Sequence, residues 1–127
     1  MSWLFIDTSD RMRTRFAVIP ALGEVRERII EGARARVVAL LASFVPRKRI
    51  RAMRGICVVA GPGPFSAIRS GVLVANILSR VYHMPLYGVS TEDGKDLDAL
   101  RDMLLRGAIS ESRYVAPVYD AEPNITT

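Results

Sequence analysis

The residues best placed to do chemistry surround a Gly-Pro-Gly turn. Gly61 and Gly63 follow a short apolar run and precede a segment with helical periodicity, and glycine adopts backbone angles that are closed to other residues. A helix N-terminus placed after such a turn attracts phosphate or carboxylate groups. The glycines also leave room for a ligand or another backbone to come close. The turn is therefore the candidate anion-binding element.

Two standard phosphate-binding motifs do not fit this turn. A P-loop requires a lysine that is missing here. A dinucleotide-binding motif requires a third glycine where Ser66 stands and an acidic residue on the next strand, 86–89. Two interpretations stay open: a tight turn without a ligand, and weak contact with a nucleotide.

A run of basic residues forms a second candidate site. Its members are Arg47, Lys48, Arg49, Arg51 and Arg54. They could contact the phosphates of a nucleic acid, in which case the affinity would fall steeply with salt. The alternative is a solvated connector, because no aromatic residues alternate with the charges for base stacking.

Nucleophilic and metal chemistry has little support. Cys57 is the only cysteine and lies in an apolar run, and nothing pairs a cysteine or serine with a nearby base. His83 is the only histidine, and a single histidine makes a poor metal site. We therefore predict no catalytic residue, no metal site and no protease activity.

The composition is that of a globular protein. The 127 residues are 50% hydrophobic, and the net charge of +5 with a pI of ≈ 10.0 favours anionic partners. We expect one domain over residues 1–119 and a polar tail over 120–127. Neither a signal peptide nor a membrane-spanning segment is expected, and the single cysteine fits a reducing compartment, so we predict a cytoplasmic protein.

Apolar runs and turn formers predict an α/β fold. Strands are expected at 3–6, 15–19, 56–60, 86–89 and, at a sheet edge, 114–119. Helices are expected at 33–45, at 65–82 and between Asp96 and Gly107, with a basic connector at 47–54. Residues 24–30 fit either a third strand or a short helix. The order of elements predicts a mixed sheet with helices on its faces.

Helices 33–45 and 65–82 carry more apolar surface than packing on one sheet requires. We therefore predict a helix-mediated protein interface, with the alternative that other segments of this chain cover the helices. Gly71 and Ala75 would let another backbone approach, and a bulky residue at Gly71 is expected to weaken partner binding and spare the fold. The predicted interface residues are Val37, Leu40, Leu41, Phe44, Phe65, Ile68, Gly71, Val72, Ala75 and Leu78.

Three motifs resemble the TsaB (YeaZ-type) family. They are Leu4-Phe5-Ile6-Asp7-Thr8-Ser9, the segment from Val58 to Gly71, and Pro85-Leu86-Tyr87-Gly88-Val89-Ser90-Thr91. They occur in the family's order, and Arg69 favours TsaB over its paralogue TsaD. Departures from the family pattern occur at Pro64, Ser66, Ala67, Ile68 and Ser70.

The resemblance implies an actin/Hsp70-like (ribonuclease H-like) fold, of which 127 residues have room for the first of two related subdomains. TsaB is the non-catalytic partner of TsaD in the synthesis of tRNA threonylcarbamoyladenosine. The resemblance thus implies a scaffold or activator without enzymatic activity, which binds a TsaD-like protein through helices 33–45 and 65–82. It also implies indirect contact with tRNA, and it leaves open a TsaE-like ATPase in the complex and a homodimer of the isolated chain.

Actin-like ATPases place an aspartate that holds metal and phosphate where Asp7 ends the first strand. The resemblance therefore implies that Asp7, Thr8 and Ser9 could face ATP or ADP with Gly61 and Gly63, at an interface with the partner, although no cofactor is required. A strand-end turn with local hydrogen bonds is the alternative. The alternative function is a stand-alone nucleotide- or tRNA-binding module that uses the Gly-Pro-Gly turn and the basic patch 47–54.

Overall fold

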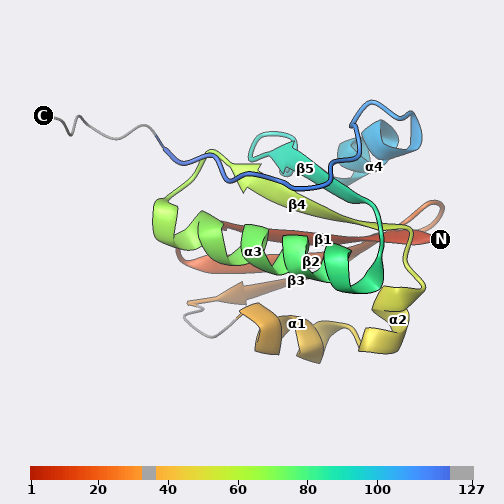
Figure 1. The fold of residues 1–127 in the computed structure, drawn as a ribbon, viewed down its shortest axis with the longest axis horizontal. Helices are drawn as coiled ribbons and strands as arrows, with labels where there is room; N and C mark the ends of the chain where they lie inside the picture. The colour runs from red at the N-terminus through yellow and green to blue at the C-terminus, as the bar shows by residue number, and fades with distance from the viewer. Residues whose placement is uncertain (33–36, 121–127) are drawn as a thin grey trace, which may run out of the picture.

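The computed structural model describes residues 1–32 and 37–120, which form one mixed sheet with helices on its faces (Figure 1). The strands are β1 (Ser2–Asp10), β2 (Arg13–Pro20), β3 (Arg26–Glu31), β4 (Gly55–Gly61) and β5 (Leu86–Ser90). They lie in the order β3-β2-β1-β4-β5. β2 is antiparallel to β1 and β3, whereas β4 is parallel to β1 and β5. The predicted α/β mixed sheet is confirmed.

The segment that fitted either a strand or a helix forms the edge strand β3. It pairs with β2 from Arg13 opposite Glu31 to Val18 opposite Arg26. Its charged side chains are exposed, which discourages another chain from pairing with this edge. The strand forms because the backbone of β2 hydrogen-bonds to it. The sequence of residues 24–30 alone does not reveal this pairing.

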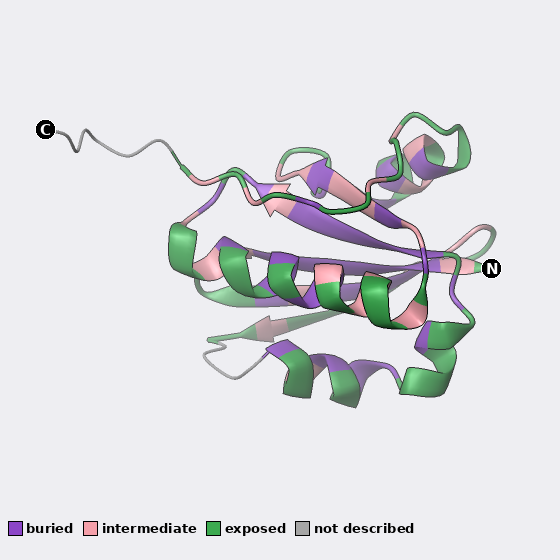
Figure 2. Ribbon diagram, in the orientation of Figure 1, coloured by how far each residue is buried: buried purple, intermediate pink, exposed green. Residues whose placement is uncertain are grey.

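The helices divide between the two faces of the sheet. α1 (Val37–Phe44), α2 (Arg47–Arg51) and α3 (Phe65–Tyr82) lie on one face, and α4 (Leu97–Leu105) lies on the other. Side chains alternate along β1, so Leu4 and Ile6 pack beneath α3, while Trp3 and Phe5 pack against α4. Figure 2 shows β1 and β4 buried along most of their length between these two cores.

The predicted cap of α4 is confirmed. The Asp96 carboxylate accepts hydrogen bonds from the Asp98 and Ala99 backbone N–H groups, both at 3.1 Å. Gly107, with φ 72°, follows the last residues of this helix. Aspartate before a helix and a left-handed glycine after it are strong local signals, which is why this helix could be bounded from sequence.

The predicted strand at 114–119 does not form. Residues 112–120, here called the C-terminal strap, instead run beside α3 and over β5 as an extended segment with isolated bridges at Ser112 and Tyr119 (Figure 1). Two backbone N–H groups anchor the strap, from Val118 to the Ala60 carbonyl at 2.7 Å and from Asp120 to the Gly63 carbonyl at 2.9 Å. Pro117 has no N–H to give, and a regular ladder would need a donor there.

The segment expected to be a basic connector is partly helical, because Arg47–Arg51 forms the short helix α2. Ile50 supplies the reason: its side chain is buried in the core, and Pro46 stands directly before the first turn, where its missing N–H costs nothing. The predicted start of helix 33–45, at residues 33–36, and the polar tail beyond residue 120 lie outside the described residues.

Candidate functional site

Helix α3 has one face on the sheet and one face in solvent. Ile68, Val72 and Ala75 are buried against β1 and β4, as the helical repeat requires. Leu73, Ile77 and Val81 recur every four residues on the other side and are 58%, 51% and 59% exposed. We call these three residues the outer stripe of α3. The helix therefore presents large apolar side chains to solvent although its sheet-facing residues are fully covered.

Most of the predicted interface residues lie inside this chain's own core. Val37, Leu41, Phe44, Ile68, Gly71, Val72 and Ala75 are buried. Leu40 and Leu78 are partly buried against the same core, and Phe65 is half exposed. These residues fix where α1 and α3 lie. The buried ones could therefore affect a partner only indirectly, by positioning the helices.

The exposed apolar residues of these two helices are the outer stripe of α3 and Val38 of α1, which is 63% exposed. None of them is among the predicted interface residues. A signal for the stripe exists in the sequence, because bulky residues recur at four-residue spacing on the side opposite Gly71 and Ala75. Small residues pack closest to a sheet, so the bulky side of this helix was the better candidate for a free surface.

The close approach at Gly71 is to strand β1. The Thr8 hydroxyl accepts a hydrogen bond from the Gly71 N–H at 3.1 Å and donates one to the Ala67 carbonyl at 2.7 Å. A Cβ atom at position 71 would lie 2.5 Å from the Thr8 Oγ1 atom. The expectation that a bulky residue at Gly71 spares the fold is therefore wrong, since the space beside this glycine is filled by Thr8.

The Gly-Pro-Gly turn likewise receives this chain's own backbone. Gly61 has φ 119°, and a Cβ atom there would collide with the Val118 carbonyl of the C-terminal strap. Gly63 is closed off by the Ile68 side chain and the Ser9 carbonyl. The glycines left room for either a ligand or another backbone, and at Gly61 the neighbour is the backbone of the C-terminal strap.

The side chain of Asp7 is engaged within the fold. Its Oδ1 atom accepts hydrogen bonds from the Ser9 N–H at 2.8 Å and the Ser9 hydroxyl at 2.6 Å. Its Oδ2 atom accepts one from Arg15 at 2.9 Å, and Arg15 also pairs with Glu27 at 2.9 Å. Asp7 and Ser9 thus make the local hydrogen bonds that stood as the alternative to a nucleotide site. They do so within β1, where its pairing with β2 is irregular between Asp7 and Asp10, because the strand does not end at Asp7 as expected.

Replacing Arg15 with leucine should destabilise the chain by about 2–3 kcal/mol, because the buried Asp7 carboxylate would lose the cation that it pairs with. Urea unfolding measures the change. Arg13 is the matched control, since its pair with Asp10 is exposed and Arg13→Leu should cost no more than about 0.5 kcal/mol. Equal effects of the two substitutions would contradict a special role for Arg15.

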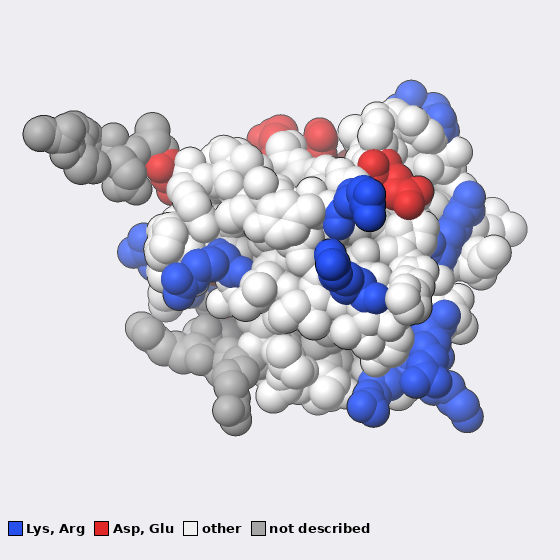
Figure 3. Space-filling model, in the orientation of Figure 1, with Lys and Arg blue, Asp and Glu red and all other residues white. Residues whose placement is uncertain are grey.

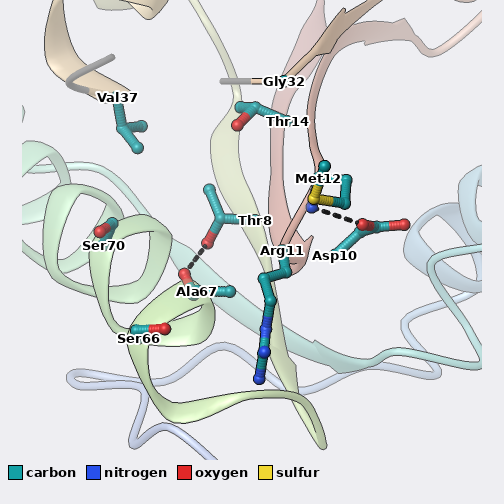
Figure 4. Close-up of a pocket in the computed structure, with 10 residues that line it drawn as sticks. All are labelled: Thr8, Asp10, Arg11, Met12, Thr14, Gly32, Val37, Ser66, Ala67 and Ser70. Atoms are coloured by element: carbon teal, nitrogen blue, oxygen red, sulfur yellow. Dashed lines mark hydrogen bonds between the residues drawn. The ribbon is translucent and has the colours of Figure 1, made fainter. Parts of the chain in front are cut away.

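A cavity of about 510 Å³ lies between the β1–β2 hairpin and the helices α1 and α3 (Figure 4). Four hydroxyl side chains face it, those of Thr8, Thr14, Ser66 and Ser70, together with Arg11. Of the five predicted nucleotide-binding residues, Thr8 alone lines this cavity. The other four, Asp7, Ser9, Gly61 and Gly63, are not brought together with it.

The five residues of the predicted nucleic-acid patch are brought together and exposed on α2 and the turn after it. The Arg51 guanidinium lies over the Tyr82 ring at 5.8 Å and that of Arg54 over the Trp3 ring at 4.8 Å. None of the five makes an ion pair within residues 1–32 and 37–120. Figure 3 shows Lys and Arg side chains gathered over α2 without an acidic neighbour.

The remaining candidates for chemistry are weak in the described part of the chain. Burial raises the pKa of the Cys57 thiol far above its ordinary value, so the reactive thiolate is disfavoured. His83 is an exposed helix cap with φ 52°. No group of three or more His, Cys, Asp or Glu side chains suited to a metal occurs among the described residues. Nor does a described helix have the length and apolar character to cross a membrane.

Comparison with known proteins places this geometry in a family. The family model of TsaD, tRNA N6-adenosine threonylcarbamoyltransferase, matches residues 17–100, which is more than half of the chain. Comparison with curated proteins gives no match.

Two solved structures share the fold. YeaZ from Pseudomonas aeruginosa aligns with a TM-score of 0.61 and 21% identity, and a protein described as uncharacterized with similarity to peptidase YeaZ, also from Pseudomonas aeruginosa, aligns with 0.60 and 21%. Each match covers 70% of this chain but 43% of the other, so the chain spans less than half the length of these relatives. The chain belongs to the TsaD family and shares its fold with YeaZ.

Proposed function

We propose that this chain is a non-catalytic subunit that docks on a TsaD-like protein through the outer sides of α1 and α3 and supports threonylcarbamoyladenosine modification of tRNA. Family membership supports the modification system. The observation that carries the docking proposal is the outer stripe of α3, where Leu73, Ile77 and Val81 are each more than half exposed. Large apolar side chains at regular spacing on a rigid helix are what a helix-mediated interface requires.

The C-terminal strap does not cover this stripe. It contacts α3 through Asn76, whose side-chain amide donates to the Val115 carbonyl and accepts from the Val115 N–H, both at 2.9 Å. It also contacts Phe65, whose ring lies 4.7 Å from that of Tyr119. The strap therefore covers one flank of the helix and leaves the outer stripe exposed. This favours a partner over the alternative that the chain itself covers the helices.

The charges around the stripe favour an acidic partner over a second copy of this chain. No Asp or Glu occurs from Gly32 to Thr91, the part of the sequence that contains α1, α2 and α3. A symmetric homodimer through these helices would bring Arg69 and Arg80 toward the same residues of the other copy, and like charges at an interface oppose association. A TsaD-like surface with carboxylates beside an apolar groove would complement this face.

Such docking would act by linkage. A subunit that binds only the competent conformation of an enzyme raises the population of that conformation and needs no catalytic residue of its own. In this proposal the chain contributes surface and rigidity, and the partner contributes the chemistry. A TsaE-like ATPase would join the same complex on other surfaces.

Replacing Leu73 and Ile77 with aspartate should weaken the complex with the TsaD-like protein of the same organism by roughly 100-fold or more, because both charges would enter the centre of the interface. Size-exclusion chromatography and titration calorimetry measure complex formation, and threonylcarbamoyl transfer to tRNA measures activation. The wild-type chain should raise the partner's activity and show none by itself. The thermal midpoint of the isolated variant should stay close to wild type, since both positions are exposed.

The matched control carries the same two added charges elsewhere. Leu22 and Leu105 are 91% and 45% exposed and lie away from α3, so Leu22→Asp with Leu105→Asp should leave binding unchanged. The proposal fails if wild type forms no complex at micromolar concentrations, if the control pair weakens binding equally, or if the chain forms a homodimer through the stripe instead.

Contact with ATP or ADP is proposed only at the interface with the partner. The hydroxyl-lined cavity beside Thr8 supports it, because a nucleotide there would find polar groups from β1, β2 and α3. The partner would have to supply the remaining contacts, since Asp7 and Gly61 are occupied by this chain. Calorimetry with ATP and ADP should show binding to the complex and none to the chain alone; binding to neither would remove the proposal.

A further inference from the structure

The acidic residues of this protein are distributed very unevenly along the chain, whereas the basic residues are not. Nine of the 18 Lys and Arg residues and none of the 13 Asp and Glu residues lie between Gly32 and Thr91. The rest of the chain carries nine basic and 13 acidic residues. Seven of these nine cations lie among the described residues, on α2, the turn after it and α3, and five of the seven fall within the eight residues 47–54.

We propose that α2 and the turn after it, residues 47–54, form a binding surface for the phosphodiester backbone of folded RNA. The surface makes its contacts through Arg47, Lys48, Arg49, Arg51 and Arg54, and it adjoins the C-terminal end of α3, where Arg51 lies over Tyr82. The inference rests on the charge and build of α2, so it stands whether or not the chain docks on a partner.

The basic surface is built on an anchored element. Ile50 and Met53 are 4% and 8% exposed and fix α2 and its turn to the core beneath α3. The Met53 N–H donates to the Ile50 carbonyl at 3.0 Å, and the Ala52 N–H donates to the Arg49 carbonyl at 3.2 Å. A mobile basic loop would lose conformational entropy on binding, whereas these cations already point out from a fixed base.

Two of the guanidinium groups are also positioned by aromatic rings. Arg51 lies over Tyr82, and Arg54 lies over Trp3. Stacking on a ring occupies the flat face of a guanidinium and leaves the N–H groups at its rim free to donate to phosphate oxygens. The charges thus have no acidic partner among the described residues and have donors directed outward.

The side chains of this surface favour a nucleic acid over the other anionic partners, which are a membrane and an acidic protein. A membrane-binding helix needs an apolar face toward the lipid, but the only apolar residue of α2, Ile50, points into the core. A protein interface needs apolar or aromatic residues at its centre, and every exposed side chain of α2 is basic. Closely spaced cations without an apolar centre fit a polymer whose charges repeat regularly, as phosphates do.

The surface should read the backbone and not the base sequence. α2 contains no aromatic residue on which an unpaired base could stack, and its Arg and Lys side chains match phosphate oxygens. Folded RNA, with two strands of phosphates bordering a groove, presents the densest target for such a cluster. The family description names tRNA, so tRNA is the natural RNA to test.

The test measures binding of the isolated full chain to unmodified tRNA by fluorescence anisotropy across a range of salt concentrations. With four or five phosphate contacts, the logarithm of the affinity should fall against the logarithm of salt with a slope of about −4. Lys48→Glu with Arg49→Glu should weaken binding roughly 50-fold near 0.1 M salt and reduce the slope by about 2. Both side chains are exposed, and the buried Ile50 that anchors α2 is unchanged, so the variant should stay folded.

The control pair is Lys95→Glu with Arg106→Glu, which changes the net charge equally in the part of the chain that contains α4. It should weaken tRNA binding by no more than about threefold, since only the overall field changes. Equal loss in both pairs, a salt slope near zero, or absence of binding would overturn the proposal. So would equally tight binding to vesicles of anionic lipid or to polyglutamate.

Binding to a DNA duplex of about 16 base pairs is compared with binding to an RNA duplex of the same length, to test which nucleic acid the surface prefers. Tighter binding of the RNA duplex supports the proposal, and tighter binding of the DNA duplex contradicts it. Because the partner protein is absent from every arm, loss of the docking proposal would leave these results unchanged. Conversely, the Lys48→Glu and Arg49→Glu variant should still bind the TsaD-like protein through α3.

Discussion

Replacing Gly71 with leucine should leave the chain largely unfolded. A Cβ atom at this position would lie 2.5 Å from Oγ1 and 3.0 Å from Cγ2 of Thr8, and a leucine side chain would extend further into β1. The helix would have to move off the sheet and break the Gly71–Thr8 hydrogen bond. We expect a loss of at least about 4 kcal/mol, which is close to the whole stability of many small domains. Soluble yield, circular dichroism and urea unfolding measure it.

The same site offers an internal control. Gly71→Ala adds only the Cβ atom and should cost about 1–3 kcal/mol despite the higher helix propensity of alanine. Thr8→Ala removes the two atoms that the new Cβ meets most closely, so the double variant should recover part of the cost of Gly71→Ala. A Gly71→Leu protein with wild-type stability and weakened partner binding would restore the interpretation drawn from sequence.

Elements with strong local signals could be predicted from the sequence. Helix α3 begins at Phe65 and ends at Tyr82 in the structure, as expected, because Pro64 and the Gly-Pro-Gly turn mark its start and its periodicity runs unbroken. The apolar run 56–60 indicated a strand covered on both faces, and β4 is buried in this way between α3 and α4. Local pattern and tertiary packing agree at these places.

The failures occur where packing, and not pattern, decides the structure. Residues 114–119 are an apolar run of the kind that indicates a strand, but they run as a strap because Asn76 and the Ala60 carbonyl hold them. Helix α2 has five residues and no repeat to detect, and it forms around one buried side chain, Ile50. A sequence window does not contain the partners that settle either segment.

The candidate site illustrates the same limit. Gly71 and Ala75 correctly indicated that something approaches α3 closely, but the sequence does not say whether the neighbour is a partner or the chain's own sheet. The sheet takes that position through Thr8, so the free surface is the opposite, bulky side of the helix. Asp7 was likewise expected to face a nucleotide, but its carboxylate pairs with Arg15 on the neighbouring strand.

The glycine of the turn provides a second large effect. Gly61→Ala should destabilise the chain by about 3–4 kcal/mol, from a left-handed backbone angle and from collision of the new Cβ with the Val118 carbonyl. The strap would have to leave the turn, and the amides of Val118 and Asp120 would lose their hydrogen bonds. Native-state hydrogen exchange should show these two amides unprotected while those of β1 stay protected.

Gly23 separates the two contributions to this cost. Its φ of 108° is close to the 119° of Gly61, but nothing lies within 4 Å of a Cβ atom there. Gly23→Ala should therefore show the backbone term alone, about 1–2 kcal/mol, and the excess at Gly61 should measure the strap. Equal costs at both glycines, or protected Val118 and Asp120 amides in Gly61→Ala, would mean that the strap does not hold the turn. A larger cost at Gly61 would show why this turn needs its glycine without any ligand, because the Val118 carbonyl fills the space beside it.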